Sequence, residues 1–331
     1  MRELVAELAL GLREHVLPHL GSHAGRAHHQ TGIGGDVTFA IDEEAEAYLE
    51  RFLAEKAPGV AYYSEDRGLV MPAPSELPAF PPEPSGFPAF PSKEMPVLLV
   101  DPIDGTRPAM AGLESCCVAV AAAPLGDGAP VMGDVEAACV VEIKSGTTFV
   151  AERGAGLQIR TADGRLPTAN LSSNTDVSRM FWTLGFRGRP AVPLVHVLGE
   201  LIDASSVGGA VFDLGSAAFD LTRLVTGQLD AYLDVGSRMI EDAPALRPLF
   251  EQVGGGAVLN NSPYDLAAPV LCLEEAGGVV TGGRGEPLAD RPLLGSGHDF
   301  QMSCVAAANA QLHARILPFV ERGIARLADR D

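Results

Sequence analysis

Apolar residues recur in steps of three and four over two segments near the N-terminus, residues 3–20 and 42–57. This spacing gathers the apolar side chains on one face and predicts two amphipathic helices. Between residues 60 and 63 a short apolar run predicts a strand, which ends at Ser64-Glu65-Asp66. A second run, Val-Leu-Leu-Val at residues 97–100, predicts a buried strand.

Beyond residue 116 the pattern changes twice. Segments rich in Val and Ala first alternate with Gly-containing turns, and from about residue 168 helical and strand-like segments alternate instead. We expect antiparallel strands at 117–122, 135–143 and 147–151, then helices at 216–226, 266–276 and 305–326 (the last as one or two helices), with strands at 229–233 and 279–281. The change predicts a single α/β domain, 1–331, made of an α+β half (1–165) and an α/β half (166–331).

Composition and charge narrow the function classes. The chain has 331 residues, of which 47% are hydrophobic, enough for a sizeable core. Its formal net charge of −19 excludes nucleic-acid binding through a general basic field. Five cysteines, none in a C-x-x-C pair, indicate a reduced, cytosolic protein without structural zinc. No run is long and apolar enough to span a membrane, and the charged N-terminal segment is not typical of a signal peptide.

The most informative chemistry is Asp101-Pro102-Ile103-Asp104-Gly105-Thr106, directly after the predicted buried strand. Two carboxylates, a carbonyl, a glycine amide and a hydroxyl would meet there. Such oxygen donors bind hard cations like Mg²⁺, and N–H groups bind phosphate oxygens. Because Asp101 and Asp104 repel each other unless a cation lies between them, the hexapeptide predicts metal-dependent phosphoryl transfer. The alternative interpretation is an ordinary Asp-Pro turn followed by an Asp-Gly turn, which is common in loops.

The D-P-I-D-G-T sequence resembles the signature of the inositol monophosphatase family, Mg²⁺-dependent, lithium-sensitive phosphatases that include fructose-1,6-bisphosphatases and nucleotide phosphatases. From about residue 34 to the C-terminal helix, further motifs of this family occur in the same order: G-D-V-T at 35–38, S-E-D at 64–66, E-R-G-A-G at 152–156, G-S-A-A at 215–218 and Y-D-L-A-A-P at 264–269. The resemblance implies the layered α-β-α-β-α sandwich of this family, which usually forms homodimers.

The resemblance also implies a site for two to three Mg²⁺ ions. Glu65, Asp101 and the carbonyl of Ile103 would hold one ion, and Asp101, Asp104 and Asp265 a second. A third, weaker ion would touch Glu65. Asp265 also stands three residues after a serine in Ser-Pro-Tyr-Asp, a pattern typical of a helix start, and its capping role is compatible with metal binding.

Catalytic and substrate contacts are implied in the same way. Thr106 and Glu65 would orient the attacking water, and Asp36 would hydrogen-bond the Thr106 hydroxyl, although taken alone Asp36 is typical of a turn or cap. The substrate-binding residues would be Gly105, Thr106, Arg107, Ala217 and Asp234. A carboxylate at Asp234 suits a polyol because it accepts hydrogen bonds from hydroxyls. The alternatives are a strand-end role for Asp234 and a surface ion pair for Arg107.

Several departures from the family pattern concern the substrate rather than the metal chemistry. Residues 71–96 hold nine prolines, which predicts a long loop without regular structure, either covering the active site or forming an exposed insertion. Residues 236–263 make a longer connection than the family commonly has. Tyr264 stands where the family has tryptophan, and Asp66 where it has a second glutamate.

We therefore expect a cytoplasmic phosphoric monoester hydrolase that cleaves a small ester, an inositol or sugar phosphate, by a metal-activated water. The enzyme alternatives are a nucleotide phosphatase, acting on a nucleoside monophosphate or 3′,5′-bisphosphate, and a phosphatase of a specialised biosynthetic pathway. The non-enzyme alternative is a catalytically silent metal- or ligand-binding protein on the same fold. The expected partners are the small phosphorylated substrate and a second copy of the chain, with no nucleic acid and no membrane.

Overall fold

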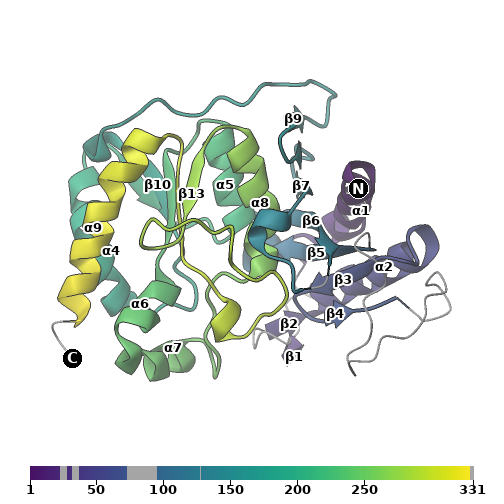
Figure 1. Ribbon diagram of the computed structural model, residues 1–331, viewed down its shortest axis with the longest axis horizontal. Coiled ribbons are helices and arrows are strands. Elements are labelled where there is room, and N and C mark those ends of the chain that lie inside the picture. Colours follow the sequence, from purple (N-terminus) through teal and green to yellow (C-terminus); the bar gives the residue numbers. More distant parts are fainter. Residues whose placement is uncertain (23–27, 32–36, 73–94, 127, 329–331) are drawn as a thin grey trace.

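The computed structural model describes residues 1–22, 28–31, 37–72, 95–126 and 128–328. The elements stack in five layers, α-β-α-β-α, which confirms the predicted architecture (Figure 1). One outer layer contains α1 (Arg2–Val16) and α2 (Ala40–Lys56). The middle layer contains α5 (Ala217–Val225) and α8 (Pro263–Glu275). The other outer layer contains α4 (Ala191–Ser205) and α9 (Ala310–Ala328). The two central helices therefore separate the two sheets.

The first sheet contains seven strands in the order β4-β3-β5-β6-β7-β8-β9. Their bounds are β3 (Ala61–Ser64), β4 (Gly68–Val70), β5 (Met95–Asp104), β6 (Cys117–Leu125), β7 (Ala137–Glu142), β8 (Thr148–Glu152) and β9 (Gly156–Arg160). Strand β5 is parallel to β3 and antiparallel to β6, and every residue in it except Pro96 is buried. Helices cover both faces of this sheet, so β5 is apolar without alternation. A separate ribbon pairs β1 (His28–Thr31) with β2 (Val37–Phe39).

The second sheet contains five strands in the order β11-β10-β12-β14-β13. Their bounds are β10 (Phe181–Leu184), β11 (Ala210–Phe212), β12 (Ala231–Asp234), β13 (Val279–Thr281) and β14 (Cys304–Ala307). Strand β10 is parallel to β11 and β12, whereas β14 is antiparallel to its neighbours β12 and β13. Because parallel strands end at the same sheet edge, the loop after β10 lies beside the end of β12, where the amide of Gly185 donates to the carbonyl of Leu233 at 2.9 Å.

One predicted element is wrong at its start. The segment 305–326 was expected to be helical throughout, but its first residues belong to β14, and α9 begins only at Ala310. A short apolar run carries no helical period, and here it is buried between two neighbouring strands. Several elements, among them β1, β2, β4, β9, β10, β11 and α4, have no counterpart in the prediction. The other expected helices and strands are confirmed within a few residues of their ends.

The two insertions differ in what the structure describes. Residues 73–94 of the proline-rich segment lie outside the described residues, so both interpretations of it stay predictions, and its last two residues already belong to β5. The stretch 236–263 instead contains α6 (Gly236–Asp242) and α7 (Arg247–Val253), which Figure 1 shows below the second sheet.

The boundary between the predicted halves at residues 165 and 166 stays a prediction, and the two sheets fall on either side of it. No helix in the described part of the chain combines the length and the apolar character needed to cross a bilayer.

Candidate metal centre

The end of β5 delivers the first two carboxylates. The pairing of β5 with β6 shifts register between Asp101 and Asp104, so the strand bends where these residues occur. Two local hydrogen bonds hold the bend: the amide of Ile103 donates to Asp101 Oδ1 at 3.0 Å, and the hydroxyl of Thr106 donates to the carbonyl of Ile103 at 3.1 Å. The chain then continues into the short helix α3 (Thr106–Ala111).

Glycine is required at position 105. Its φ of 86° lies in the left-handed region, and a Cβ there would be 2.6 Å from the carbonyl oxygen of Ser115. The Asp-Gly pair of the sequence motif therefore serves the bend that brings β5 into α3.

Asp265 reaches the same place from the first turn of α8. Ser262 precedes the helix, Pro263 is its first residue, and the amide of Ser262 donates to Asp265 Oδ2 at 2.6 Å. The predicted helix start is thus confirmed, and an acid in the first turn also faces the positive end of the helix dipole. The ring of Tyr264 stacks on Tyr63 of β3, with centroids 6.3 Å apart, and this contact ties α8 to the strand that precedes Glu65.

The three carboxylates lie close enough to share a cation. One oxygen from each of Asp101, Asp104 and Asp265 lies within 4.8 Å of the others. Burial raises the pKa of Asp104 to about 6, and burial together with the charge of Asp104 raises the pKa of Asp265 to about 7. The pKa of Asp101 rises well above its ordinary value, through burial first and then through repulsion from Glu65 and Asp104. Oxygen donors that repel one another in this way fit a hard divalent cation.

Helix α5 orients Asp104 from the other side. The hydroxyl of Ser216 and the backbone amide of Ala218 both donate to Asp104 Oδ2, the first at 2.8 Å. These bonds lower the pKa of Asp104 against the effect of burial. The G-S-A-A motif therefore has a structural role beyond the predicted substrate contact of Ala217, because it joins α5 to the end of β5.

The turn after β3 brings in the acidic Ser-Glu-Asp sequence. Glu65 faces the cavity, whereas Asp66 accepts a hydrogen bond of 2.6 Å from the hydroxyl of Thr38 in β2. Asp66, whose role the sequence left open, thus fastens the segment that follows Asp36 to the segment that carries Glu65.

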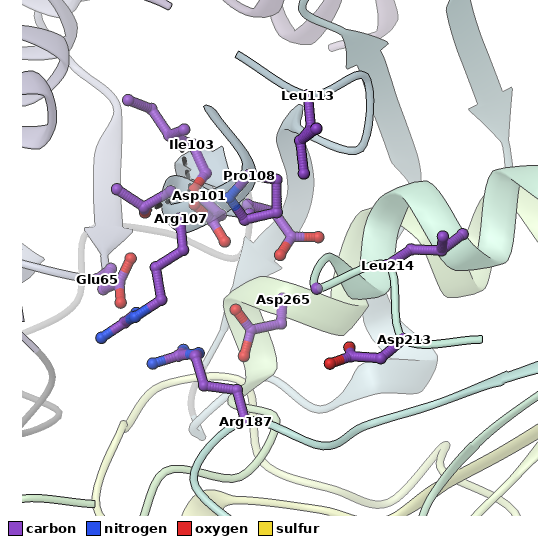
Figure 2. A pocket seen from close by; sticks show the side chains of 14 residues that line it. Glu65, Asp101, Ile103, Arg107, Pro108, Leu113, Arg187, Asp213, Leu214 and Asp265 are labelled. Carbon is purple, nitrogen blue, oxygen red and sulfur yellow. Dashed lines mark hydrogen bonds between the residues drawn. The ribbon is translucent and has the colours of Figure 1, made fainter. Parts of the chain in front are cut away.

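These groups surround a cavity of about 350 Å³ (Figure 2). Its lining includes eight of the predicted residues: Glu65, Asp101, Ile103, Asp104, Gly105, Thr106, Arg107 and Asp265. Figure 2 shows the guanidinium groups of Arg107 and Arg187 on the side of the cavity where Glu65 lies, with Asp213 on the far side of Asp265.

Three predicted residues lie elsewhere. Ala217 lines a smaller adjoining cavity, and Asp36 lies outside the described residues. Asp234 lines neither cavity: its side chain is fully buried, and both of its carboxylate oxygens meet the guanidinium of Arg189, one at 3.3 Å. In this structure Asp234 anchors Arg189, which agrees with the strand-end alternative.

Sequence reasoning missed the residues that β10 and β11 bring to the cavity. Arg187 follows β10, and Asp213 and Leu214 follow β11. Neither strand was predicted, so nothing indicated that the loops after them would reach the site. The charge of Arg187 lowers the pKa of both Asp104 and Asp265.

Comparisons with known proteins agree with this geometry. The model of the inositol monophosphatase family matches residues 2–325. An inositol-1-monophosphatase SuhB of Mycobacterium tuberculosis is 25% identical over 251 residues, covering 74% of this chain and 76% of that protein. A Nus factor SuhB of Vibrio cholerae is 24% identical over 249 residues, covering 74% and 72%.

A solved structure shares the fold over almost the full length. The IMPase of Thermotoga maritima superposes with a TM-score of 0.66 at 18% identity, covering 98% of each chain. With the family model matching nearly all residues, the chain belongs to the inositol monophosphatase family, a family of phosphoric monoester hydrolases.

Proposed function

We propose that this protein is a Mg²⁺-dependent phosphomonoesterase that hydrolyses a small phosphate ester, with an inositol or sugar phosphate as the first candidate. The observation that carries the proposal is the set of three carboxylates, Asp101, Asp104 and Asp265, whose oxygens lie within 4.8 Å at one cavity. In the same cavity the side chains of Arg107 and Arg187 supply positive charge that suits an anionic substrate.

Two to three Mg²⁺ ions would be held by Asp101, Asp104, Asp265, Glu65 and the carbonyl of Ile103. Bound there, Mg²⁺ supplies the positive charge that offsets the negative charge developing on the phosphate oxygens. The raised pKa values of Asp104 and Asp265 support this assignment, because metal-free carboxylates at these positions repel one another.

The chain's own groups position the reactants. The Thr106 hydroxyl donates its proton to the carbonyl of Ile103, so the oxygen keeps lone pairs that accept a hydrogen bond from the attacking water. Glu65 faces the same cavity and orients that water as a general base. The amides of Gly105 and Thr106, with Arg107, hold the phosphate. Asp36 would orient Thr106 by accepting its hydroxyl proton in place of the Ile103 carbonyl when that carbonyl holds a metal ion.

The proposal includes no covalent phospho-enzyme. Among the described residues that line the cavity, the only hydroxyl or thiol belongs to Thr106. All five cysteines are buried, and burial raises the pKa of Cys116, which lies nearby, to about 12. A thiolate nucleophile is therefore not available there.

Phosphate release from a panel of esters tests the proposal. The panel contains inositol 1-phosphate, hexose phosphates, nucleoside monophosphates and 3′,5′-bisphosphates, each assayed with Mg²⁺ and with excess chelator. We expect chelator-sensitive turnover, highest for a sugar or inositol phosphate. Calorimetric Mg²⁺ binding without hydrolysis of any ester would instead identify a silent binding protein, an outcome relevant to a family that includes a relative named as a Nus factor.

Quaternary structure and location are proposed on the resemblance alone. We propose a cytoplasmic homodimer, which light scattering coupled to size-exclusion chromatography measures directly for the purified chain.

A further inference from the structure

A second, smaller cavity of about 70 Å³ adjoins the metal centre. The two cavities share Asp104, Arg187, Asp213, Gly215 and Asp265, so a ligand at the carboxylates reaches both. Asp213, visible beside Asp265 in Figure 2, marks the boundary between them. The smaller cavity is lined mainly by polar groups and has room for a few water-sized groups, which suits the hydroxyl-bearing part of an ester.

The family resemblance assigns recognition of a substrate hydroxyl to Asp234, but Asp234 does not line this cavity. Asp234 is paired with Arg189, and its Oδ1 also accepts from the amide of Gly236 at 2.9 Å. Its carboxyl carbon packs against Gly185, where an added Cβ would lie 2.8 Å from it. Asp234 could reach a ligand hydroxyl only by breaking a buried ion pair.

Asn260, in the inserted stretch 236–263, stands at the cavity instead. Its side chain is 7% exposed, and neither its Oδ1 nor its Nδ2 has a hydrogen-bond partner within the described part of the chain. Asp220, at 2% exposure, also lines the cavity, but its carboxylate accepts a hydrogen bond from the buried hydroxyl of Thr183. A buried side-chain amide is costly to leave unpaired, so a polar ligand group is expected beside Asn260.

Hydrogen bonds fix the backbone around Asn260, whereas its side-chain amide has no partner in the described part of the chain. The Asn260 amide N–H donates to Gln301 Oε1 at 3.3 Å, and the neighbouring carbonyl of Leu259 accepts from Arg189 at 2.8 Å. The side chain of Asn261 donates to the Tyr232 hydroxyl at 2.9 Å. The segment is therefore fixed at three points, and the same Arg189 that withdraws Asp234 also positions Asn260.

Space for the Asn260 amide is kept by a glycine. A Cβ added at Gly236 would lie 2.1 Å from Asn260 Oδ1. Any other residue at position 236 would displace the amide.

Resting on the proposed function, we propose that Asn260 determines specificity for the alcohol part of the ester, in place of Asp234. It recognises a hydroxyl on a carbon next to the phosphorylated one. The side-chain amide Nδ2–H donates a hydrogen bond to the hydroxyl oxygen. The substrate class is therefore a phosphate ester of a vicinal polyol, recognised through a residue of the insertion.

Two esters of the same shape test the inference: glycerol 2-phosphate, which has hydroxyls on the adjacent carbons, and isopropyl phosphate, which lacks them. We expect wild-type kcat/KM to favour glycerol 2-phosphate by about tenfold or more. Asn260→Leu removes both polar atoms at similar size and should abolish the preference by slowing only the hydroxylated ester. Gln252→Leu alters an exposed amide of α7 that lines neither cavity, and it should retain the preference.

A binding measurement separates this inference from the proposed function. Calorimetric titration of both esters into the Ca²⁺-loaded protein should show tighter binding of glycerol 2-phosphate in the wild type and in Gln252→Leu, but not in Asn260→Leu. If the wild type hydrolyses neither ester yet shows this binding difference, the proposed function fails and the inference stands.

Three results would overturn the inference: equal wild-type kcat/KM and affinity for the two esters, an unchanged preference in Asn260→Leu, or an equal loss for both esters in that variant with a lower Tm. If Asn260→Leu does not fold, the same measurements on Asn260→Asp test the inference. It keeps the size and one acceptor but lacks the Nδ2–H donor, so the preference should shrink, and an unchanged preference contradicts the proposal.

Discussion

Two parts of the cavity are built in different ways. We call Asp101, Asp104 and Asp265 the floor, and Arg107, Leu113, Arg187, Asp213 and Leu214 the wall. The floor comes from a strand end and a helix start and is buried or half-buried, with oxygens oriented by backbone amides and Ser216. The wall comes from the short helix α3 and from loops, and Leu113, Arg187 and Asp213 are exposed. We therefore expect the floor to set the chemistry and the wall to contribute to the choice of substrate.

The largest expected effect comes from breaking the floor. Asp104→Asn should reduce Mg²⁺-dependent phosphate release by about 1,000-fold while the Tm stays near that of the wild type, because one negative oxygen ligand is lost without a change in shape. Steady-state kinetics with saturating Mg²⁺ measures it. Asp213→Asn, on the wall, is the comparison and should change KM more than kcat. Near-wild-type turnover in Asp104→Asn would refute the site.

The second effect tests the buried ion pair between Arg189 and Asp234, which lies next to the wall residue Arg187. Arg189→Met leaves Asp234 buried without its partner and should lower the free energy of unfolding by about 3–5 kcal/mol, measured by denaturant titration. The control is Asp163→Asn, which removes an exposed pair with Arg165 and should leave the unfolding midpoint unchanged. Equal midpoints for the two variants would contradict a structural role for the Arg189–Asp234 pair.

The third effect tests the position of the attacking water. Thr106→Val keeps the size but removes the hydroxyl that bonds the carbonyl of Ile103, and kcat should fall about 100-fold. Thr106→Ser retains the hydroxyl and should recover most of the rate. If valine and serine variants have equal kcat, Thr106 has no role in orienting the water.

The smallest effect is a dependence of metal binding on pH. The pKa values of Asp104 and Asp265, about 6 and about 7, lie above the ordinary value of 3.8. Between pH 3.8 and about pH 7 the metal-free native protein therefore binds more protons than the unfolded chain does. These two groups make the native protein less stable as pH rises through that range.

Because Mg²⁺ replaces those protons, its Kd should be about tenfold lower at pH 8 than at pH 6, and it should raise the Tm more at pH 8. Calorimetry and thermal unfolding with and without Mg²⁺ measure this. A Tm increase independent of pH would show that Mg²⁺ binds away from these carboxylates, and Asp104→Asn should reduce the pH dependence.

The floor was predictable because its residues are adjacent or nearly adjacent to strong local signals. An apolar run followed by D-P-I-D-G-T indicates a buried strand that ends in carboxylates, and Ser-Pro-Tyr-Asp indicates a helix start. Helices α1 and α2 were also easier to assign, since their apolar residues follow a clear helical period, whereas β10 and β11 are short and their burial depends on distant helices.

The amino-acid sequence alone therefore predicted the layered fold, through its resemblance to a family, and predicted which acids meet at the candidate metal centre, because strand ends and helix caps are decided by neighbouring residues. Only the tertiary structure decided that Asp234 pairs with Arg189, that Arg187 and Asp213 reach the cavity, and that Asn260 lines the smaller adjoining cavity. These outcomes depend on which loops meet at the edge of the second sheet, and packing between residues far apart in the chain controls that meeting.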